Sequence, residues 1–168
     1  MKENIQQLIK RLEMQPHPEG GYYKETYRST GVIEPHHLPA QIQGERNFST
    51  CIYFMLTSEN FSSFHELKQD EIWHFYDGSP IDFHMITPVV EHIHQVIGTD
   101  FEKSQVPQFI IPGGSCFAAK VIERDSYSLI GCTVSPGFSF EDFKLKTRAE
   151  LKAEFPHHKE IIEQFTRG

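Results

Sequence analysis

His65 and Glu71, two residues that could transfer protons, lie in the stretch 64–78, FHELKQDEIWHFYDG. A histidine can take up a proton near neutral pH, and a carboxylate can orient or charge-balance its ring. The residues 72–76 are mostly β-branched or aromatic, which predicts a strand. Because successive side chains of a strand point to opposite faces, Glu71 shares a face with the aromatic Trp73. An ionised carboxylate on such a wall is costly unless it is paired, binds a metal or faces a wet cavity, so this stretch predicts a site.

Four further residues are candidates for binding a substrate. Arg46 begins a stretch that carries Ser49 and Tyr53. Its guanidinium could hold an anionic group of a substrate through two parallel hydrogen bonds, although an ion pair with one of the chain's own acids explains it equally well. Ser63, on the strand that carries His65, is the fourth candidate.

Three pairs of histidines resemble ligand pairs and are assigned no chemistry. His92 and His94 have the i, i+2 spacing of two ligands on one face of a strand, but Glu91 and Gln95 flank them and indicate a solvated outer strand. The pairs 36–37 and 157–158 are expected in a loop and at the start of a helix, where exposed imidazoles are ordinary.

The elements that must position these residues are mainly short strands. Aromatic and β-branched runs, separated by turn residues, predict strands at 22–29, 48–56, 61–65, 72–76, 81–86, 89–97, 108–111, 116–123 and 127–134. Regular short strands of this kind are typical of a sandwich or barrel. Helical spacing predicts an amphipathic helix over 4–14 with Asn4 as its cap. Thr147 and Glu150 form a capping box before a helical tail in which Pro156 opens a second helix, and 30–45 is expected to be a long loop.

Composition sets the class of protein. A chain of 168 residues fits one domain, which we divide into a helix and lead-in at 1–20, a barrel at 21–145 and C-terminal helices at 146–168. The net charge of −7, with 16 scattered basic residues, argues against a nucleic-acid partner. The N-terminal residues are charged throughout, so we expect no membrane span and a cytoplasmic protein. The three cysteines, with no Cys-x-x-Cys spacing, are expected to be buried thiols.

The spacing of His65, Glu71 and Gly78 resembles the first motif of the cupin superfamily, Gly-x5-His-x-His-x3/4-Glu-x6-Gly. Leu67 stands at the position of the second histidine. In the second motif, Pro-x-Gly-x2-His, Phe117 stands at the position of the third histidine. The strings HPEGGYYKETYRS, STCIYFML, DEIWHFYDG and PGFSFEDF, followed by RAELKAEFPHHKEIIEQFT, look like cupin family five, a domain of unknown function, over nearly the whole chain.

This resemblance implies an all-β jelly-roll barrel with an N-terminal helix and a C-terminal helical tail. It also implies a homodimer, and a shape related to that of sugar-nucleotide epimerases and germin-like proteins. Val, Ile and Phe on both faces of several strands independently favour a covered outer face. Ligands of a jelly roll bind inside the barrel, where Trp73 and Phe117 would offer stacking surfaces to a planar or sugar-like molecule.

Cupins typically hold a metal with three histidines and one glutamate, and only His65 and Glu71 occupy those positions here. We therefore expect no cofactor, with weak binding of a divalent metal at these two residues as the alternative. The function that follows is a metal-independent epimerase or isomerase acting on a sugar-like or carbonyl substrate, with His65 as base and Glu71 as its partner. The alternatives are a non-catalytic module that binds or senses a small molecule, and a metal-dependent cupin with an incomplete ligand set.

Overall fold

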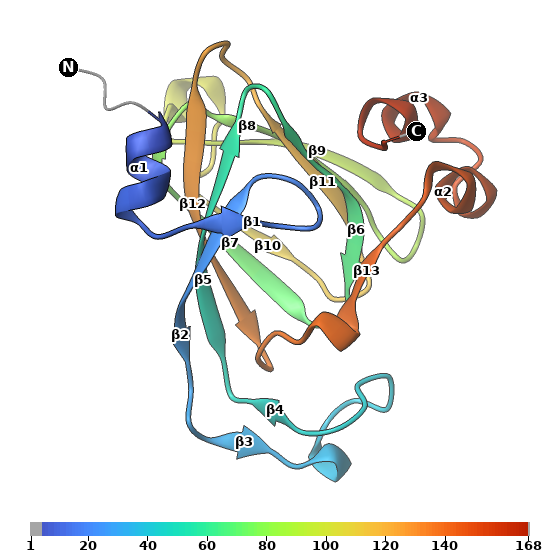
Figure 1. Ribbon diagram of the computed structural model, residues 1–168. Coiled ribbons are helices and arrows are strands. Elements are labelled where there is room, and N and C mark those ends of the chain that lie inside the picture. The colour runs from blue at the N-terminus through green and yellow to red at the C-terminus, as the bar shows by residue number, and fades with distance from the viewer. Residues whose placement is uncertain (1–4, 168) are drawn as a thin grey trace.

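The computed structural model describes residues 5–167, and two antiparallel sheets form most of it (Figure 1). The first sheet has the order β1-β2-β5-β12-β7-β10 and the second has the order β13-β6-β11-β8-β9. The strands of the first sheet are Gln15–Pro16, Tyr22–Arg28, Thr50–Thr57, Tyr127–Ser135, Asp70–Gly78 and Gln108–Ile111. Those of the second are Phe143–Leu145, Phe61–Leu67, Cys116–Val121, Ile81–Ile86 and His92–Ile97. Neighbours in space are often distant in sequence, as the jelly roll expected from the sequence requires.

Side chains that alternate along the strands fill the space between the two sheets. Phe54, Trp73, Phe83, Phe117 and Ile130 are at most 2% exposed and form the centre of this inner core. The rings of Trp73 and Phe83 meet edge to face with centroids 5.2 Å apart. The period-2 pattern of the sequence therefore assigns the faces of these strands correctly.

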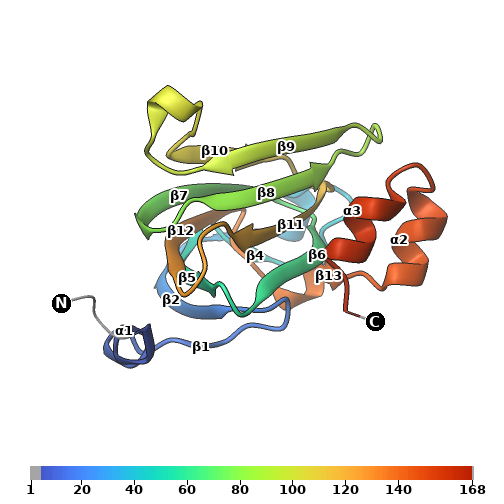
Figure 2. The ribbon, with the colours of Figure 1, turned by 90° about the horizontal axis from the view of Figure 1, so that it is seen from above.

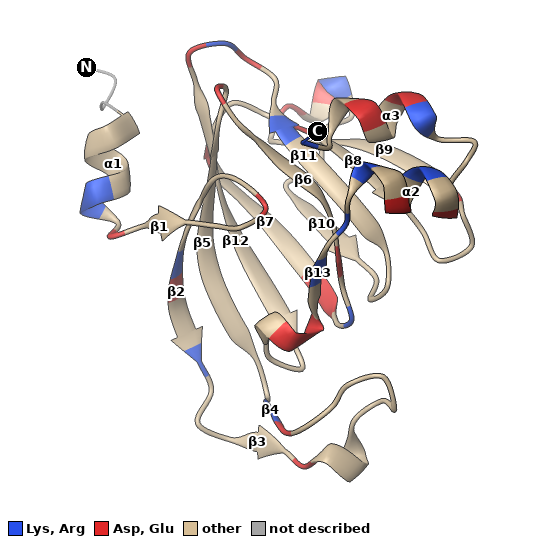
Figure 3. Ribbon diagram, turned by 45° about the vertical axis from the view of Figure 1, so that its right-hand side comes forward, with Lys and Arg blue, Asp and Glu red and all other residues tan. Residues whose placement is uncertain are grey.

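The C-terminal helices pack on the outer face of the second sheet. Helices α2, Arg148–Glu154, and α3, Lys159–Gln164, bury apolar side chains against Phe64, Cys116 and Ala118. Thr147 and Glu150 form the expected capping box. The helix expected to open at Pro156 begins at Lys159 instead. Figure 2 shows these helices beside β6, and Figure 3 shows that charged residues are frequent in them and in the loops.

The N-terminal helix α1 spans Ile5–Arg11, and the Asn4 cap expected for it lies outside the described residues. The segment expected to be a long loop contains one 3-10 turn, η1 (Pro35–His37), and strand β3 (Val32–Ile33), which pairs with β4 (Arg46–Asn47). Within residues 5–167 no helix is long and apolar enough to cross a membrane.

Candidate functional site

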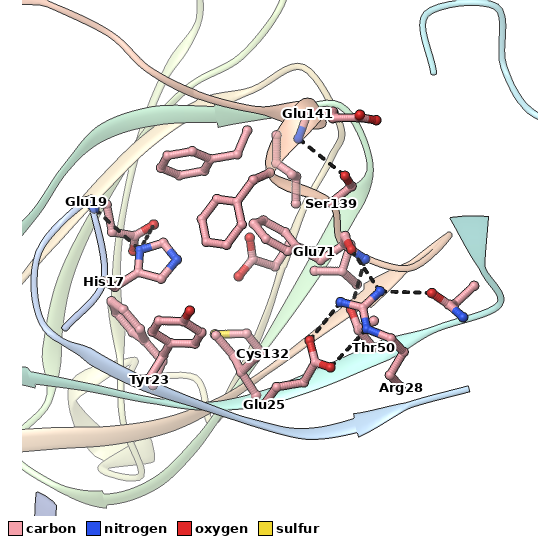
Figure 4. A pocket seen from close by; sticks show the side chains of 18 of the residues that line it. His17, Glu19, Tyr23, Glu25, Arg28, Thr50, Glu71, Cys132, Ser139 and Glu141 are labelled. Atoms are coloured by element: carbon pink, nitrogen blue, oxygen red, sulfur yellow. Dashed lines mark hydrogen bonds and ion pairs between the residues drawn. The ribbon is translucent and has the colours of Figure 1, made fainter. Parts of the chain in front are cut away.

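A cavity of about 590 Å³ opens between the two sheets at the end where β7 begins. Strands β1, β2, β4, β5, β6, β7, β12 and β13 contribute to its wall, together with the loop that joins β1 to β2 and residues of and before η3 (Phe140–Asp142). Figure 4 shows Glu71 at the centre of the view, with Glu19 and His17 on one side and Arg28 with Glu25 on the other. The apolar part of the wall includes Tyr23, Phe54, Phe138, Phe140 and Phe143.

Glu71 projects from β7 into this cavity, as strand alternation predicts. Its Oε1 accepts a hydrogen bond from Trp73 Nε1 at 2.8 Å, and the Cys132 thiol is a second hydrogen-bond partner. Burial raises the pKa of Glu71 to about 7, although both hydrogen bonds act in the opposite direction. The carboxyl group is therefore close to half ionised at neutral pH, which suits a group that both takes and returns a proton.

His65 projects from β6, and both of its ring nitrogens have partners. Nδ1 lies 2.7 Å from the Ser63 carbonyl oxygen, and Nε2 lies 3.1 Å from Glu19 Oε2. Its ring meets that of Phe117, its cross-strand neighbour, with centroids 4.1 Å apart. Burial lowers the pKa of His65 to about 3, so the ring is neutral at pH 7. This value differs from the sequence hypothesis, in which His65 is a base near neutral pH with Glu71 as its partner.

Glu19 lies between two imidazoles in the loop that joins β1 to β2. Its Oε2 is 3.1 Å from His65 Nε2 and 3.3 Å from His17 Nδ1, while Oε1 accepts a hydrogen bond from Ser62 Oγ at 2.8 Å. Burial, and then the negative charge of Glu71, raise the pKa of Glu19 well above its ordinary value. Burial and this neighbouring charge therefore both favour the protonated form of Glu19.

The hydrogen bonds indicate where this proton lies. A carbonyl oxygen only accepts, so His65 Nδ1 must donate to Ser63, and Nε2 of the neutral ring is left as an acceptor. The backbone N–H of Glu19 points at His17 Nδ1 at 3.4 Å, which makes that nitrogen an acceptor too. Burial lowers the pKa of His17 to about 4, so this ring is also neutral. We infer these tautomers from the bonding pattern: a single proton on Glu19 Oε2 faces two acceptor nitrogens.

Two glycines allow the Glu19 loop to lie against the barrel. Gly20 has φ of 120°, and a Cβ at this position would clash with the Phe61 carbonyl oxygen. Gly21 has φ of 73° and approaches the Met55 carbonyl oxygen in the same way. The backbone of Glu19 is then fixed by a bond from Ser63 N to its carbonyl oxygen at 2.9 Å. The Gly-Gly pair of the HPEGG string thus serves close packing.

Two arginines line the cavity, and the guanidinium group of each already has a carboxylate partner. Arg28 donates to Glu25 Oε1 at 2.9 Å and Oε2 at 2.7 Å. Arg46, a candidate for holding a substrate anion, donates to Asp142 Oδ2 at 2.7 Å and Oδ1 at 3.0 Å. Its Nη2 also reaches Glu141 at 3.2 Å. The ion-pair interpretation of Arg46 that the sequence left open therefore describes its contacts.

The other candidates from the sequence do not line the cavity. Trp73 and Phe117 are 1% exposed and belong to the inner core, Trp73 behind Glu71 and Phe117 behind His65. Ser49 donates to the Val134 carbonyl oxygen, and Ser63 accepts from Arg167. Tyr53 meets the exposed Tyr76 on the outer face of the first sheet. Of the eight candidates, His65, Glu71 and Arg46 are in the cavity wall.

The structure adds residues that the sequence hypothesis did not include. His17, Glu19 and Tyr23 lie within the string HPEGGYYKETYRS, and Phe138 and Phe140 lie within PGFSFEDF. Both strings carry the family resemblance in the sequence, and this resemblance is the signal from which these residues could have been found. No local pattern shows that they meet at His65, because their contact depends on long-range strand pairing.

A metal of the usual cupin type does not fit the residues at its expected position. Leu67 and Phe117 offer no donor atom, and both nitrogens of His65 are occupied. Across residues 5–167, the cluster of His, Cys, Asp and Glu side chains close enough to hold an ion is Asp82, His84 and His94, outside this cavity. The donor set in the barrel thus suits proton chemistry better than metal binding.

Sequence comparison finds relatives over most of the chain. A family model described as Cupin superfamily (DUF985) matches residues 6–146. Uncharacterized protein YML079W of Saccharomyces cerevisiae is 32% identical over 162 residues, which cover 89% of this chain and 79% of that protein.

Solved structures show the same similarity. A hypothetical protein from Leishmania major has a TM-score of 0.89 and 32% identity, with coverage of 99% of this chain and all of that one (100%). Protein SO0799 from Shewanella oneidensis has a TM-score of 0.88 and 36% identity, with 98% of both chains covered. Oxalate decarboxylase from Bacillus subtilis, in a structure at pH 4.6, has a TM-score of 0.54 and 14% identity over 89% of this chain and 36% of its own, which shows a shared fold alone.

Proposed function

Since this chain belongs to the family described as Cupin superfamily (DUF985), we propose that it binds a small neutral molecule in the barrel cavity and moves protons on it. The substrate class is a sugar or another hydroxy-carbonyl compound, and the reaction is an epimerisation or isomerisation. The observation that carries the proposal is Glu71, a buried carboxyl group at the cavity wall with a pKa of about 7.

The charges of the cavity wall favour a neutral ligand. The wall includes five glutamates, at positions 19, 25, 45, 71 and 141, and two arginines. Each arginine is matched by at least one carboxylate, so an anionic ligand would have to displace an ion pair. A hydroxyl-rich ligand instead finds carboxyl groups to bond with and aromatic rings to pack against.

The two buried carboxyl groups divide the proton transfer between them. Glu71 in its ionised form takes the proton from the carbon next to a carbonyl group. Glu19, which is protonated, returns a proton to that carbon, and exchange with solvent restores both groups. His65 and His17 are positioning residues that accept the Glu19 proton and hold its carboxyl group at the cavity wall. A base must be partly ionised at neutral pH, and Glu71, with a pKa of about 7, meets this requirement.

Hydrogen exchange tests this proposal. The full chain is incubated in D₂O with a panel of neutral aldoses, ketoses and small hydroxy-ketones, and deuterium incorporation next to the carbonyl is followed by NMR. Thermal shifts on the same panel report binding. We expect at least one compound to raise Tm and to exchange, and Glu71→Gln to slow the exchange by at least about 100-fold while the Tm shift persists. If no compound of the panel raises Tm or incorporates deuterium, the result counts against the proposal.

A non-catalytic binding module is the second candidate. The aromatic wall formed by Tyr23, Phe54, Phe138, Phe140 and Phe143 favours it, since such a wall binds a ligand without reacting with it. The same experiment separates the two functions. A binding module raises Tm with its ligand, shows no exchange above that of buffer, and keeps its affinity in Glu71→Gln.

A further inference from the structure

A second cluster of titratable side chains lies on the outer face of the second sheet, away from the barrel cavity. Asp82 and His84 stand two positions apart on β8, and His94 lies directly across from His84 on β9. The ring planes of His84 and His94 are stacked, with centroids 4.6 Å apart. The sequence pattern suggested a solvated strand at His92 and His94, but it did not show that β8 brings a carboxylate and a third imidazole to the same face.

Two imidazole nitrogens converge on a single carboxylate oxygen. Asp82 Oδ1 lies 2.7 Å from His94 Nε2 and 3.2 Å from His84 Nε2. One ligand atom from each of the three residues lies within 4.8 Å of the other two. Tetrahedral zinc, with bonds of about 2.0–2.1 Å, requires ligand atoms separated by roughly 3.3 Å. Two of the observed separations, 2.7 Å and 3.2 Å, lie close to this value, and the third is at most 4.8 Å.

The hydrogen bonds around the cluster are suited to metal binding by His84 Nε2. His84 Nδ1 lies 3.1 Å from His92 Nε2. When Nε2 of His84 binds a cation, its proton moves to Nδ1, which then donates to His92. A metal-binding histidine usually has such a partner for its second nitrogen, and this partner fixes the orientation of the ring.

The surroundings hold the three side chains in place and leave one side open. His84 packs against the ring of Phe165 beyond α3, with centroids 5.1 Å apart, and its side chain is 10% exposed. His94 is half exposed, so an ion and a water molecule can approach from solvent. Lys120 Nζ lies 3.5 Å from Asp82 Oδ2, the oxygen that does not face the histidines. Lys120 thus opposes a cation by its charge without occupying the ligand oxygen.

We infer that Asp82, His84 and His94 form a binding site for a divalent transition metal of the zinc class, with water as fourth ligand and His92 as a positioning residue. Two imidazoles and a carboxylate are a donor set that suits zinc, cobalt, nickel and copper better than magnesium or calcium. The bound ion would join edge strand β9 to β8. This site is independent of the function proposed for the barrel.

Metal titration of the untagged full chain tests this inference. The chain is stripped with EDTA, and zinc affinity is measured by competition with a chromogenic chelator. We expect about one zinc per chain with a micromolar or lower Kd. His94→Ala and Asp82→Asn should each weaken binding at least about 10-fold, and His92→Ala should weaken it about 10-fold through the second nitrogen of His84. Lys120→Met should tighten binding severalfold. His37→Ala, in the exposed η1 turn, is the control that should change nothing.

Two further measurements make the outcome decisive. Cobalt(II) bound at the site should give the intense visible absorption of a four-coordinate ion, and this absorption should be lost in His94→Ala. Because His94 is half exposed, this variant should keep its fold, which circular dichroism checks. A Kd weaker than about 1 mM, or affinity that is unchanged in His94→Ala, would overturn the inference. So would loss of zinc in His65→Ala but not in His94→Ala, which would place the ion in the barrel.

Discussion

At the scale of single residues, the site depends on two buried carboxyl groups whose pKa values are both raised above the ordinary value. Glu71 lies on an apolar wall beside Trp73, and burial is the main cause of its raised pKa. The pKa of Glu19 is raised by burial and then by the charge of Glu71. Because the two charges repel, ionisation of one carboxyl group disfavours ionisation of the other.

The raised pKa of Glu71 predicts how stability changes with pH. Glu71 titrates near pH 4.5 in the unfolded chain and near pH 7 in the folded protein. Between these values only the folded state keeps the proton, so this residue lowers stability as pH rises, by about 3 kcal/mol in total. Glu71→Gln has no such dependence. The free energy of unfolding, measured with urea at pH 5, 6, 7 and 8, should therefore fall more with rising pH in the wild type than in the variant. An equal pH dependence of the two proteins would contradict the raised pKa.

The proton on Glu19 predicts a difference between two substitutions. In Glu19→Gln the amide can donate to His65 and His17 and its oxygen can accept from Ser62, so the free energy of unfolding should change by less than about 1 kcal/mol. Glu19→Ala leaves these partners unpaired and should cost about 3 kcal/mol. Equal losses in the two variants would instead indicate an ionised Glu19 beside a charged His65. Imidazole ¹⁵N shifts report the charge of His65 directly.

At the scale of elements, a buried ion pair fastens strand β4 to η3. Arg46 and Asp142 are 96 positions apart in the chain and share two hydrogen bonds. The Asp142 side chain is fully buried and also accepts a bond from Gln69 at 2.6 Å. This fastening holds Phe140 and Phe143 over the cavity, so Arg46 contributes to the site through the fold.

Removing one charge of this pair should be costly. Asp142→Asn leaves Arg46 without its bidentate partner and should lower the free energy of unfolding by about 3 kcal/mol. The double variant Asp142→Asn/Arg46→Met should lose less stability than the sum of the losses in the two single variants, since the unpaired buried charge is then gone. Glu141→Gln is the matched control: it contacts the same arginine from a 74% exposed position and should change stability by less than about 0.5 kcal/mol. Additive losses in the double variant would contradict the pairing.

At the scale of the whole molecule, the outer face of the first sheet carries apolar side chains that nothing in residues 5–167 covers completely. Tyr76 and Ile110 are 54% and 57% exposed, and the Tyr76 ring lies across Gly131 of β12. Large exposed apolar patches often mark protein interfaces. The homodimer expected from the sequence therefore stays a prediction, and this face is its candidate interface.

Sedimentation velocity at micromolar concentration tests the dimer. The wild type should sediment as a dimer, and Tyr76→Asp combined with Ile110→Asp should shift it to a monomer, because buried charges would face each other across the interface. Phe101→Asp, at a 70% exposed position in the 3-10 turn η2 (Phe101–Lys103), should leave the dimer intact. A monomeric wild type would contradict the prediction.

The sequence by itself determined the short strands and which of their side chains face inward, because the strand period of two is a local property, and its resemblance to cupin family five implied the jelly roll. It thus predicted that Glu71 and His65 line a site. Only the tertiary structure decided the partners of the candidate residues. His65 contacts Glu19 rather than Glu71, and Arg46 binds Asp142 rather than a substrate. The tertiary structure also decided that Asp82 meets His94. The physical reason is that pKa values and partners depend on burial and on contacts between distant strands, which no local pattern encodes.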